Sequence, residues 1–314
     1  GRAGGFGLEL GVDRADQAIA LREHGADWVV RDLGELSADR IEAWFTHRGD
    51  ARPNAIAHWA ELAAELRGRR PALFLDYDGT LTPIVERPDM ATLGDDVRDT
   101  LRRVAAVWPT TIISGRDREN VTRLVGLDGI NYAGSHGYDI AGPGADGVRL
   151  EVARDVAPVI ASAADELRRR TEGIPGVIVE HKKYAASVHY RMADETRVPE
   201  VERIVDDVLA QHPALRKGAG KKVFELRPAM EWDKGRAVLW LLEALGLDRP
   251  DVVPIYIGDD VTDEDAFRAL VDRGIGILVA EIPRPTAARY ALQDVHEVRT
   301  LLERLAALRG AGER

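Results

Sequence analysis

Four short apolar runs, each followed by a segment with helical spacing, most strongly limit the folds open to this chain. They are "ALFLD" at 72–76, "TTIIS" at 110–114, "VVPIYIGDD" at 252–260 and "GIGILVA" at 274–280. Apolar strands that alternate with helices are typical of a parallel sheet covered by helices on both faces. The sequence therefore predicts an α/β fold with a doubly wound parallel sheet.

The middle of the chain has a different pattern. The turn-rich stretch "AGPGADG" is followed by two long helical segments, expected at 155–171 and 195–211, and by strands expected at 177–191 and up to Leu226. Two helices beside such strands favour a separate α+β unit. We expect this unit to be a cap, residues 142–228, inserted into a core formed by residues 71–141 and 229–314.

Composition excludes several classes of function. The 314 residues include no cysteine, which rules out disulfides, thiolate metal sites and cysteine nucleophiles. A formal net charge of −10 argues against broad binding to nucleic acid or to an anionic membrane. No apolar run approaches the length of a membrane span, and the opening "GRAGGFGLEL" lacks the pattern of a signal peptide. We expect a cytoplasmic protein with a small-molecule partner.

Polar residues follow three of the predicted strands at the point where each strand ends. Asp76 and Asp78 follow the first strand, Ser114 the second and Asp259 the third. The carboxyl ends of such strands meet at one edge of the sheet, where ligands bind. Taken singly, an acid before a turn or a serine before a helix has a structural explanation. Taken together, these residues indicate one site.

The acids at this edge suit a metal and an anion. Two carboxylates as close as Asp76 and Asp78 repel each other unless a cation lies between them or one is protonated. Asp76, Asp259 and Asp263 offer the oxygen ligands that Mg²⁺ prefers. Lys234 begins a predicted helix, whose N-terminus favours anions as well. The sequence therefore predicts a Mg²⁺ site beside a phosphate site.

Phosphoryl transfer is the reaction that these residue types serve. A carboxylate such as Asp76 can act as a nucleophile and form an acyl phosphate. Asp78 can protonate the leaving alcohol and later activate water. Ser114 and Lys234 can hold the phosphoryl oxygens, because this reaction needs mostly charge neutralisation and positioning.

Four runs resemble, in order, the motifs of the haloacid dehalogenase superfamily. They are "DYDGTLTP" at 76–83, "ISGR" at 113–116, "KG" at 234–235 and "GDDVTDEDAF" at 258–267. The predicted insertion lies between the second and third motifs, where C2-type caps occur in that superfamily. The resemblance implies Asp76 as nucleophile and Asp78 as general acid and base. It also implies a Mg²⁺ ion held by Asp76, the main-chain carbonyl of Asp78 and Asp259, with Asp263 either a direct ligand or a support for the direct ligands.

Three further runs resemble the trehalose-6-phosphate phosphatase family. They are "GSHG" at 134–137, "VEHKKYAASVHYR" at 179–191 and "FELRP" at 224–228. The resemblance implies that a phosphorylated disaccharide is bound by Arg116, Gly134 and His136 in the core and by Glu180, Lys182 and Glu225 in the cap. Alternation along a strand supports this, since Glu180 and Lys182 share one face. An ordinary charge pair on a solvated face is the alternative for those two.

The implied activity is Mg²⁺-dependent hydrolysis of trehalose 6-phosphate, the last step of trehalose biosynthesis. A capped phosphatase for another sugar phosphate, such as sucrose phosphate or glucosylglycerate phosphate, is the nearest alternative. A non-catalytic sugar-phosphate sensor and a phosphotransferase are the others. The motif acids do not distinguish among the sugar phosphates, and the sequence leaves the oligomeric state open.

The front of the chain carries no paired acids of its own. Residues 1–49 have a strand–helix–strand pattern that resembles the tail of a haloacid dehalogenase-type domain. A linking helix is expected within residues 50–70. We expect the front piece to be a structural appendage.

Overall fold

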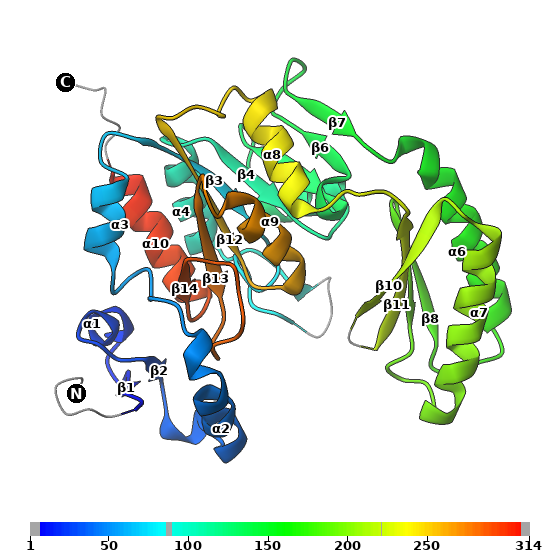
Figure 1. Ribbon diagram of the computed structural model, residues 1–314, viewed down its shortest axis with the longest axis horizontal. Coiled ribbons are helices and arrows are strands. Elements are labelled where there is room, and N and C mark those ends of the chain that lie inside the picture. The colour runs from blue at the N-terminus through cyan, green and yellow to red at the C-terminus, as the bar shows by residue number, and fades with distance from the viewer. Residues whose placement is uncertain (1–6, 86–89, 221, 309–314) are drawn as a thin grey trace.

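Within residues 7–85, 90–220 and 222–308, which the computed structural model describes, the largest sheet has eight strands (Figure 1). From β14 to β5 every neighbouring pair is parallel. This confirms the predicted doubly wound sheet. In spatial order the strands are β14 (Tyr290–Leu292), β13 (Ile275–Val279), β12 (Val252–Gly258), β3 (Arg70–Leu75), β4 (Thr110–Ile113), β5 (Asn131–Gly134), β6 (Asp139–Ala141) and β7 (Arg149–Glu151).

The large sheet continues past residue 142, where the sequence placed the start of the cap. Strands β6 and β7 pair in antiparallel fashion, with Asp139 opposite Glu151. The turn-rich stretch 141–147 closes this hairpin, and the Gly142 amide donates a hydrogen bond to the Val148 carbonyl at 2.7 Å. The glycines and proline therefore connect two strands of the core before the chain enters the cap.

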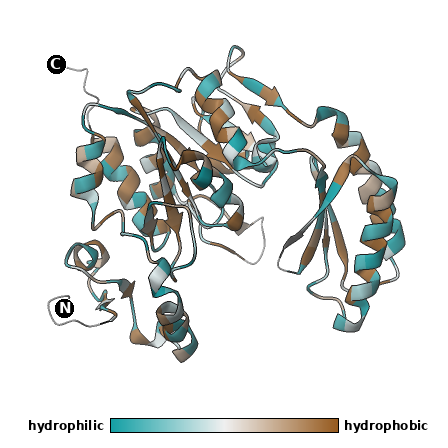
Figure 2. Cartoon of the chain, viewed as in Figure 1, coloured by the Kyte–Doolittle hydropathy of each residue, from teal (hydrophilic) through white to brown (hydrophobic). Residues whose placement is uncertain are grey.

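Helices cover both faces of the large sheet because successive strand residues point to opposite sides. Leu73 and Leu75 pack with one set of helices, whereas Phe74 packs with the other. In Figure 2 the strands β3 and β12 at the centre of the sheet are mainly brown, the colour of hydrophobic residues. The first set is α3 (Trp59–Glu65), α4 (Asp95–Ala105), α5 (Arg118–Val125) and α10 (Val295–Ala307), and the second is α8 (Lys234–Ala244) and α9 (Glu264–Leu270).

The cap is a separate four-stranded antiparallel sheet with two helices on its far side (Figure 1). Its own hydrophobic core lies between the sheet and the helices. The open face of the sheet is turned towards the core. The strands, in spatial order, are β10 (Leu215–Gly220), β11 (Val223–Pro228), β9 (Ala185–His189) and β8 (Ile178–Lys182), and the helices are α6 (Ala157–Thr171) and α7 (Val198–Gln211).

We call residues 7–50 the N-terminal unit. Its strands β1 (Leu10–Val12) and β2 (Trp28–Val30) are parallel and are joined through α1 (Ala18–Glu23), and α2 (Ala38–His47) follows. The predicted strand–helix–strand pattern is confirmed.

A glutamine of the core takes the place of a third strand beside β2. The Val29 amide donates to Gln293 Oε1 at 2.9 Å, and Gln293 Nε2 donates to the Val29 carbonyl at 2.6 Å. The unit is also joined to the core by a buried ion pair, with Arg22 Nε 2.6 Å from Glu297 Oε1. Among the described residues, no helix is both long and apolar enough to cross a membrane.

Candidate active site

Three carboxylates meet at the carboxyl edge of the large sheet. Asp76 directly follows β3, Asp259 directly follows β12, and Asp263 lies in the turn after β12. Each contributes an oxygen, and these oxygens lie within 4.8 Å of one another. Asp76 and Asp263 are buried, whereas Asp259 is half-buried. The sequence predicted this grouping, because the carboxyl ends of parallel strands meet at one edge of the sheet. The structure adds that β3 and β12 are direct neighbours.

A buried lysine lies inside the acid cluster. The Nζ atom of Lys234 donates to Asp76 Oδ1 at 2.7 Å and to Asp263 Oδ1 at 2.6 Å. Burial alone would lower the pKa of Lys234, but the charges of Asp263 and Asp76 outweigh it and hold that pKa above its usual value. Asp233 caps the helix that Lys234 begins by accepting a hydrogen bond from the Arg236 amide at 2.8 Å. The lysine is therefore a fixed positive charge.

One ammonium does not balance three carboxylates. Burial raises the pKa of Asp76 well above its usual range despite Lys234, and burial with the charges of Asp263 and Asp260 raises the pKa of Asp259 to about 7. The Oδ1 atom of Asp259 is buried and accepts no hydrogen bond. A divalent cation fits these residues, because it would neutralise the excess charge and bind the free oxygen.

The second motif acid has a different partner. Arg116 donates to Asp78 through Nε at 2.7 Å and Nη2 at 2.6 Å, which makes a bidentate pair. The guanidinium also lies 5.5 Å from the ring centre of Tyr77. Gly79, which follows Asp78 in the sequence, has a φ of +81°. A Cβ on this residue would lie 2.2 Å from Asp259 Oδ2. Only glycine lets the chain pass so close to the Asp259 carboxylate.

The "ISGR" and "GSHG" segments touch each other at the same edge. The Ser114 hydroxyl accepts from the Arg116 amide at 3.1 Å, and the Ser114 carbonyl accepts from the His136 amide at 2.9 Å. His136 has a φ of +57°, a conformation that few non-glycine residues adopt. Burial, followed by the charge of Lys234, lowers the pKa of His136 well below its usual value. A Cβ on Gly134 would lie 2.1 Å from the Arg118 amide nitrogen, so glycine is required there.

The three predicted cap residues share the open face of the cap sheet. Glu180 is paired with Ser187 across β8 and β9, and Ser187 with Glu225 across β9 and β11. Ser187 Oγ donates to Glu225 Oε1 at 3.2 Å. Glu180 lies 3.1 Å from His189 and 3.7 Å from Lys182 Nζ. The cap thus presents an ordered row of hydrogen-bonding groups.

Cap and core line one cavity of about 270 Å³ beside Lys234. Arg216 and Arg227 contribute from the cap, and His136 and Thr262 from the core. The cavity is rich in positive charge, which suits an anionic ligand.

Two residues whose side chains contact Asp259 or Asp263 were not predicted. The Tyr256 hydroxyl donates to Asp263 Oδ1 at 2.6 Å, and Arg284 donates to the Asp259 carbonyl at 2.6 Å. Tyr256 is two residues before Gly258 in β12, and residues two apart in a strand point to the same face. Strand alternation could therefore have placed the Tyr256 side chain near the residues that follow Gly258. Arg284 belongs to the segment after β13, and its sequence carries no comparable signal.

The fold and the acid cluster together define a class, the capped phosphatases of the haloacid dehalogenase type. The model of one family, trehalose-phosphatase, matches residues 74–296. The chain belongs to the trehalose-phosphatase family, which confirms the resemblance seen in the sequence.

Relatives and solved structures agree with this. The chain is 45% identical over 277 residues to trehalose 6-phosphate phosphatase RA3 of Zea mays, covering 83% of this chain and 77% of that protein. It is 43% identical over 313 residues to the trehalose-phosphate phosphatase of Mycobacterium tuberculosis, covering 97% and 78%. The C-terminal domain of the Candida albicans trehalose-6-phosphate phosphatase superposes with a TM-score of 0.67 at 26% identity, covering 82% of this chain and 98% of that one.

Proposed function

We propose that this protein hydrolyses trehalose 6-phosphate to trehalose and phosphate. The observation that carries the proposal is the grouping of Asp76, Asp259 and Asp263 around Lys234 in a chain of the trehalose-phosphatase family. A phosphorylated disaccharide is the small-molecule partner. A cytoplasmic location stays a prediction.

In the first step, a carboxylate oxygen of Asp76 attacks phosphorus, and the bond from phosphorus to the sugar oxygen breaks. Asp78 gives a proton to that oxygen, so the sugar leaves as a neutral alcohol. Both oxygens of Asp78 accept hydrogen bonds from Arg116 in the structure. Arg116 must therefore turn from Asp78 towards the substrate before Asp78 can donate.

In the second step, water attacks phosphorus and releases Asp76 from the aspartyl phosphate. Asp78, now a carboxylate, takes a proton from that water. Lys234 and Ser114 hold phosphoryl oxygens through both steps.

The side chains of Asp76, Asp259 and Asp263, with the Asp78 carbonyl, would hold a Mg²⁺ ion. When bound, that ion neutralises the negative charge that Asp76 and the phosphoryl group bring together.

We assign the sugar to the open face of the cap sheet. Glu180, Lys182 and Glu225 offer carboxylate and ammonium groups, each of which can form several hydrogen bonds with hydroxyls. On the core side we assign Arg116, Gly134 and His136 to the substrate, and His136 lines the cavity between cap and core. Closure of the cap would exclude bulk water from the reaction.

Phosphate release from a panel of sugar phosphates tests the proposal. Trehalose 6-phosphate should be the preferred substrate over sucrose phosphate and glucosylglycerate phosphate, with turnover that needs Mg²⁺ and stops after chelation. Preference for another sugar phosphate would move the assignment to that substrate. Binding without turnover would indicate a sensor.

A further inference from the structure

The main chain of Asp259 is held by a side chain that the mechanism does not use. Nη2 of Arg284 donates to the Asp259 carbonyl at 2.6 Å. On its other side, the Asp259 carboxylate packs against Gly79, where a Cβ would lie 2.2 Å from Oδ2. Asp259 Oδ1 is buried without a hydrogen-bond partner. The residue is therefore fixed from both sides, while one carboxylate oxygen stays free for a ligand.

Arg284 lies in the segment between β13 and β14, and the N-terminal unit holds this segment. Trp28 Nε1 donates to Glu281 Oε1 at 3.3 Å, and Arg40 forms an ion pair with the same oxygen. The Arg40 guanidinium also lies 5.3 Å from the ring centre of Trp28, which is fully buried. Glu281 is three residues before Arg284, so the stretch 281–284 is held by the N-terminal unit at Glu281 and by Asp259 at Arg284.

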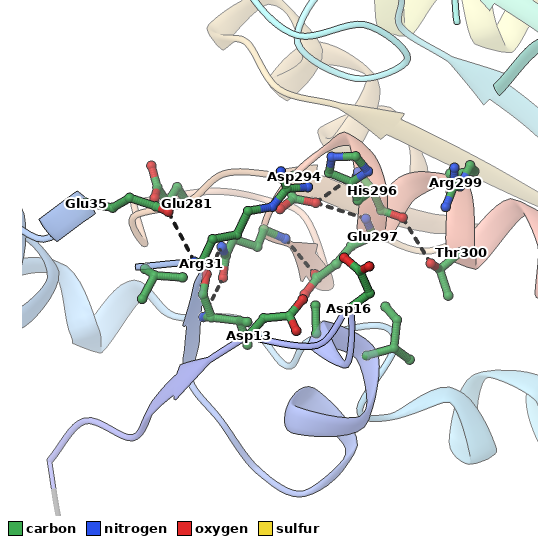
Figure 3. Close-up of a pocket in the computed structure, with 15 residues that line it drawn as sticks. Asp13, Asp16, Arg31, Glu35, Glu281, Asp294, His296, Glu297, Arg299 and Thr300 are labelled. Atoms are coloured by element: carbon green, nitrogen blue, oxygen red, sulfur yellow. Dashed lines mark hydrogen bonds between the residues drawn. The ribbon is translucent and has the colours of Figure 1, made fainter. Parts of the chain in front are cut away.

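Glu281 also lines two cavities. One of about 430 Å³ is lined by Arg31 and Glu35 from the N-terminal unit and by Glu281 and Asp294 from the core (Figure 3). Another, of about 350 Å³, is lined by Glu281 and Arg284 among others. Within this segment, Glu281 contacts the N-terminal unit and Arg284 contacts Asp259. The remainder is held separately, for example by the hydrogen bond that the Ala287 amide donates to Glu264 Oε2.

We propose that Arg284 is a positioning residue that fixes the Asp259 main chain so that its carboxylate faces the metal, and that Glu281 transmits support from the N-terminal unit. The inference rests on the proposed function, since it concerns the same metal site. It gives the N-terminal unit a role beyond that of an appendage.

Electrostatics and positioning predict opposite results, which makes the proposal testable. Arg284 is a cation close to a cation site, so its charge alone would weaken Mg²⁺ binding. Removing it should then tighten binding. If Arg284 instead holds Asp259 in place, removing it should weaken binding, as loss of a group that orients a metal ligand typically does by about 10- to 100-fold.

Isothermal titration of the full chain with Mg²⁺ alone measures this without any substrate. We expect Arg284→Ala to raise the dissociation constant by about tenfold or more, and Arg284→Lys to restore part of the loss because one donor remains. Arg289→Ala is the matched control, since Arg289 belongs to the same segment but pairs with Glu65. Unchanged or tighter binding in a folded Arg284→Ala protein would overturn the proposal, as would a wild type that binds no Mg²⁺.

A double-variant comparison tests the link to the N-terminal unit. Arg40→Ala should weaken Mg²⁺ binding by about two- to fivefold. If Arg40 acts through Arg284, the double variant should bind no more weakly than Arg284→Ala alone. If the losses of Mg²⁺ affinity in the two single variants add up in the double variant, Arg40 does not act through Arg284.

The phosphatase assay separates this proposal from the proposed function. Arg284-dependent Mg²⁺ binding without turnover of trehalose 6-phosphate would leave the positioning role standing and remove the substrate assignment. Turnover of trehalose 6-phosphate, together with Mg²⁺ binding that does not depend on Arg284, would support the substrate assignment and remove the positioning role.

Discussion

Arg116 and Asp78 form a bidentate pair in which the guanidinium donates two hydrogen bonds, at 2.7 Å and 2.6 Å, to the carboxylate. Such pairs are strong and planar. In the proposed reaction Asp78 must carry a proton, so the pair must separate when substrate binds. The phosphoryl group of the substrate is the anion that can replace Asp78 as the hydrogen-bond acceptor of the Arg116 guanidinium. Arg116 would then be both a substrate ligand and a means of releasing the acid.

Replacing Arg116 tests this exchange of partners. Arg116→Ala should lower kcat/KM by about 10- to 150-fold, the usual range for losing a hydrogen bond to a charged group. Arg116→Lys should recover little, because an ammonium cannot reproduce the fork. Steady-state kinetics with Arg123→Ala, an exposed arginine of α5, as control would measure the effect. Wild-type kinetics in Arg116→Lys would show that the bidentate geometry is unimportant.

Two isosteric changes separate the roles of Asp76 and Asp78. Asp76→Asn removes the nucleophile, so we expect no turnover and no covalent phosphate. Asp78→Asn should retain substrate binding but lower turnover by about 10²- to 10⁴-fold, the typical contribution of general acid and base catalysis. Mass spectrometry of acid-quenched enzyme detects the phosphoenzyme. A phosphate covalently bound at residue 76 of the Asp76→Asn protein would refute the assignment.

Substrate choice should depend on the cap. Glu180→Ala or Glu225→Ala leaves a sugar hydroxyl unpaired in a closed site, at a cost of about 1–3 kcal/mol. That corresponds to about a 5- to 150-fold loss of kcat/KM for trehalose 6-phosphate. A small phosphate ester that does not reach the cap sheet should lose little and serves as the internal control. Equal losses on both substrates would place these residues in the chemistry or the fold.

The site residues at the strand ends could be predicted, because the direction of the strands determines where these residues lie. Asp76, Ser114 and Asp259 each follow an apolar strand, and parallel pairing brings such positions together. The contact of Arg116 with Asp78 depends on side-chain rotamers, which no periodicity specifies. The hairpin of β6 and β7 was missed because a turn-rich sequence is typical both of a linker between domains and of a hairpin turn. The docking of the N-terminal unit through Arg22 and Glu297 joins residues 275 positions apart, beyond any local pattern.

That buried ion pair should matter for stability. Arg22→Ala leaves the Glu297 carboxylate buried without its cation, which typically costs about 3–5 kcal/mol. Urea unfolding should show the loss. Arg102→Ala, which removes an exposed pair with Asp99 within α4, should cost less than about 1 kcal/mol. Similar losses in both variants would mean that Arg22 does not anchor the N-terminal unit.

Two buried tyrosines should make the fold sensitive to alkali. Burial raises the pKa of Tyr77 and of Tyr132 to about 12, against about 10 in an unfolded chain. Between these values the unfolded chain loses both protons and the folded chain keeps them. The free energy of unfolding should therefore fall as pH rises above about 10, by about 1.4 kcal/mol per pH unit for each tyrosine.

Denaturant titrations at several alkaline pH values measure that slope. Tyr132→Phe should reduce it by the share of one tyrosine, although it also loses the hydrogen bond that the hydroxyl donates to the Leu127 carbonyl at 2.7 Å. An unchanged slope in a Tyr77→Phe, Tyr132→Phe protein would assign the alkaline sensitivity to other groups.

The amide of Gln293 has a consequence for how molecules of this protein meet one another. An open strand edge presents free N–H and C=O groups, and another chain can pair with them and begin aggregation. At Val29 both groups are already bound by one glutamine side chain. An incoming strand would have to displace two hydrogen bonds before it formed its own. A two-stranded sheet thus gains at this position the resistance to self-association that larger sheets obtain from charged or proline-containing edges.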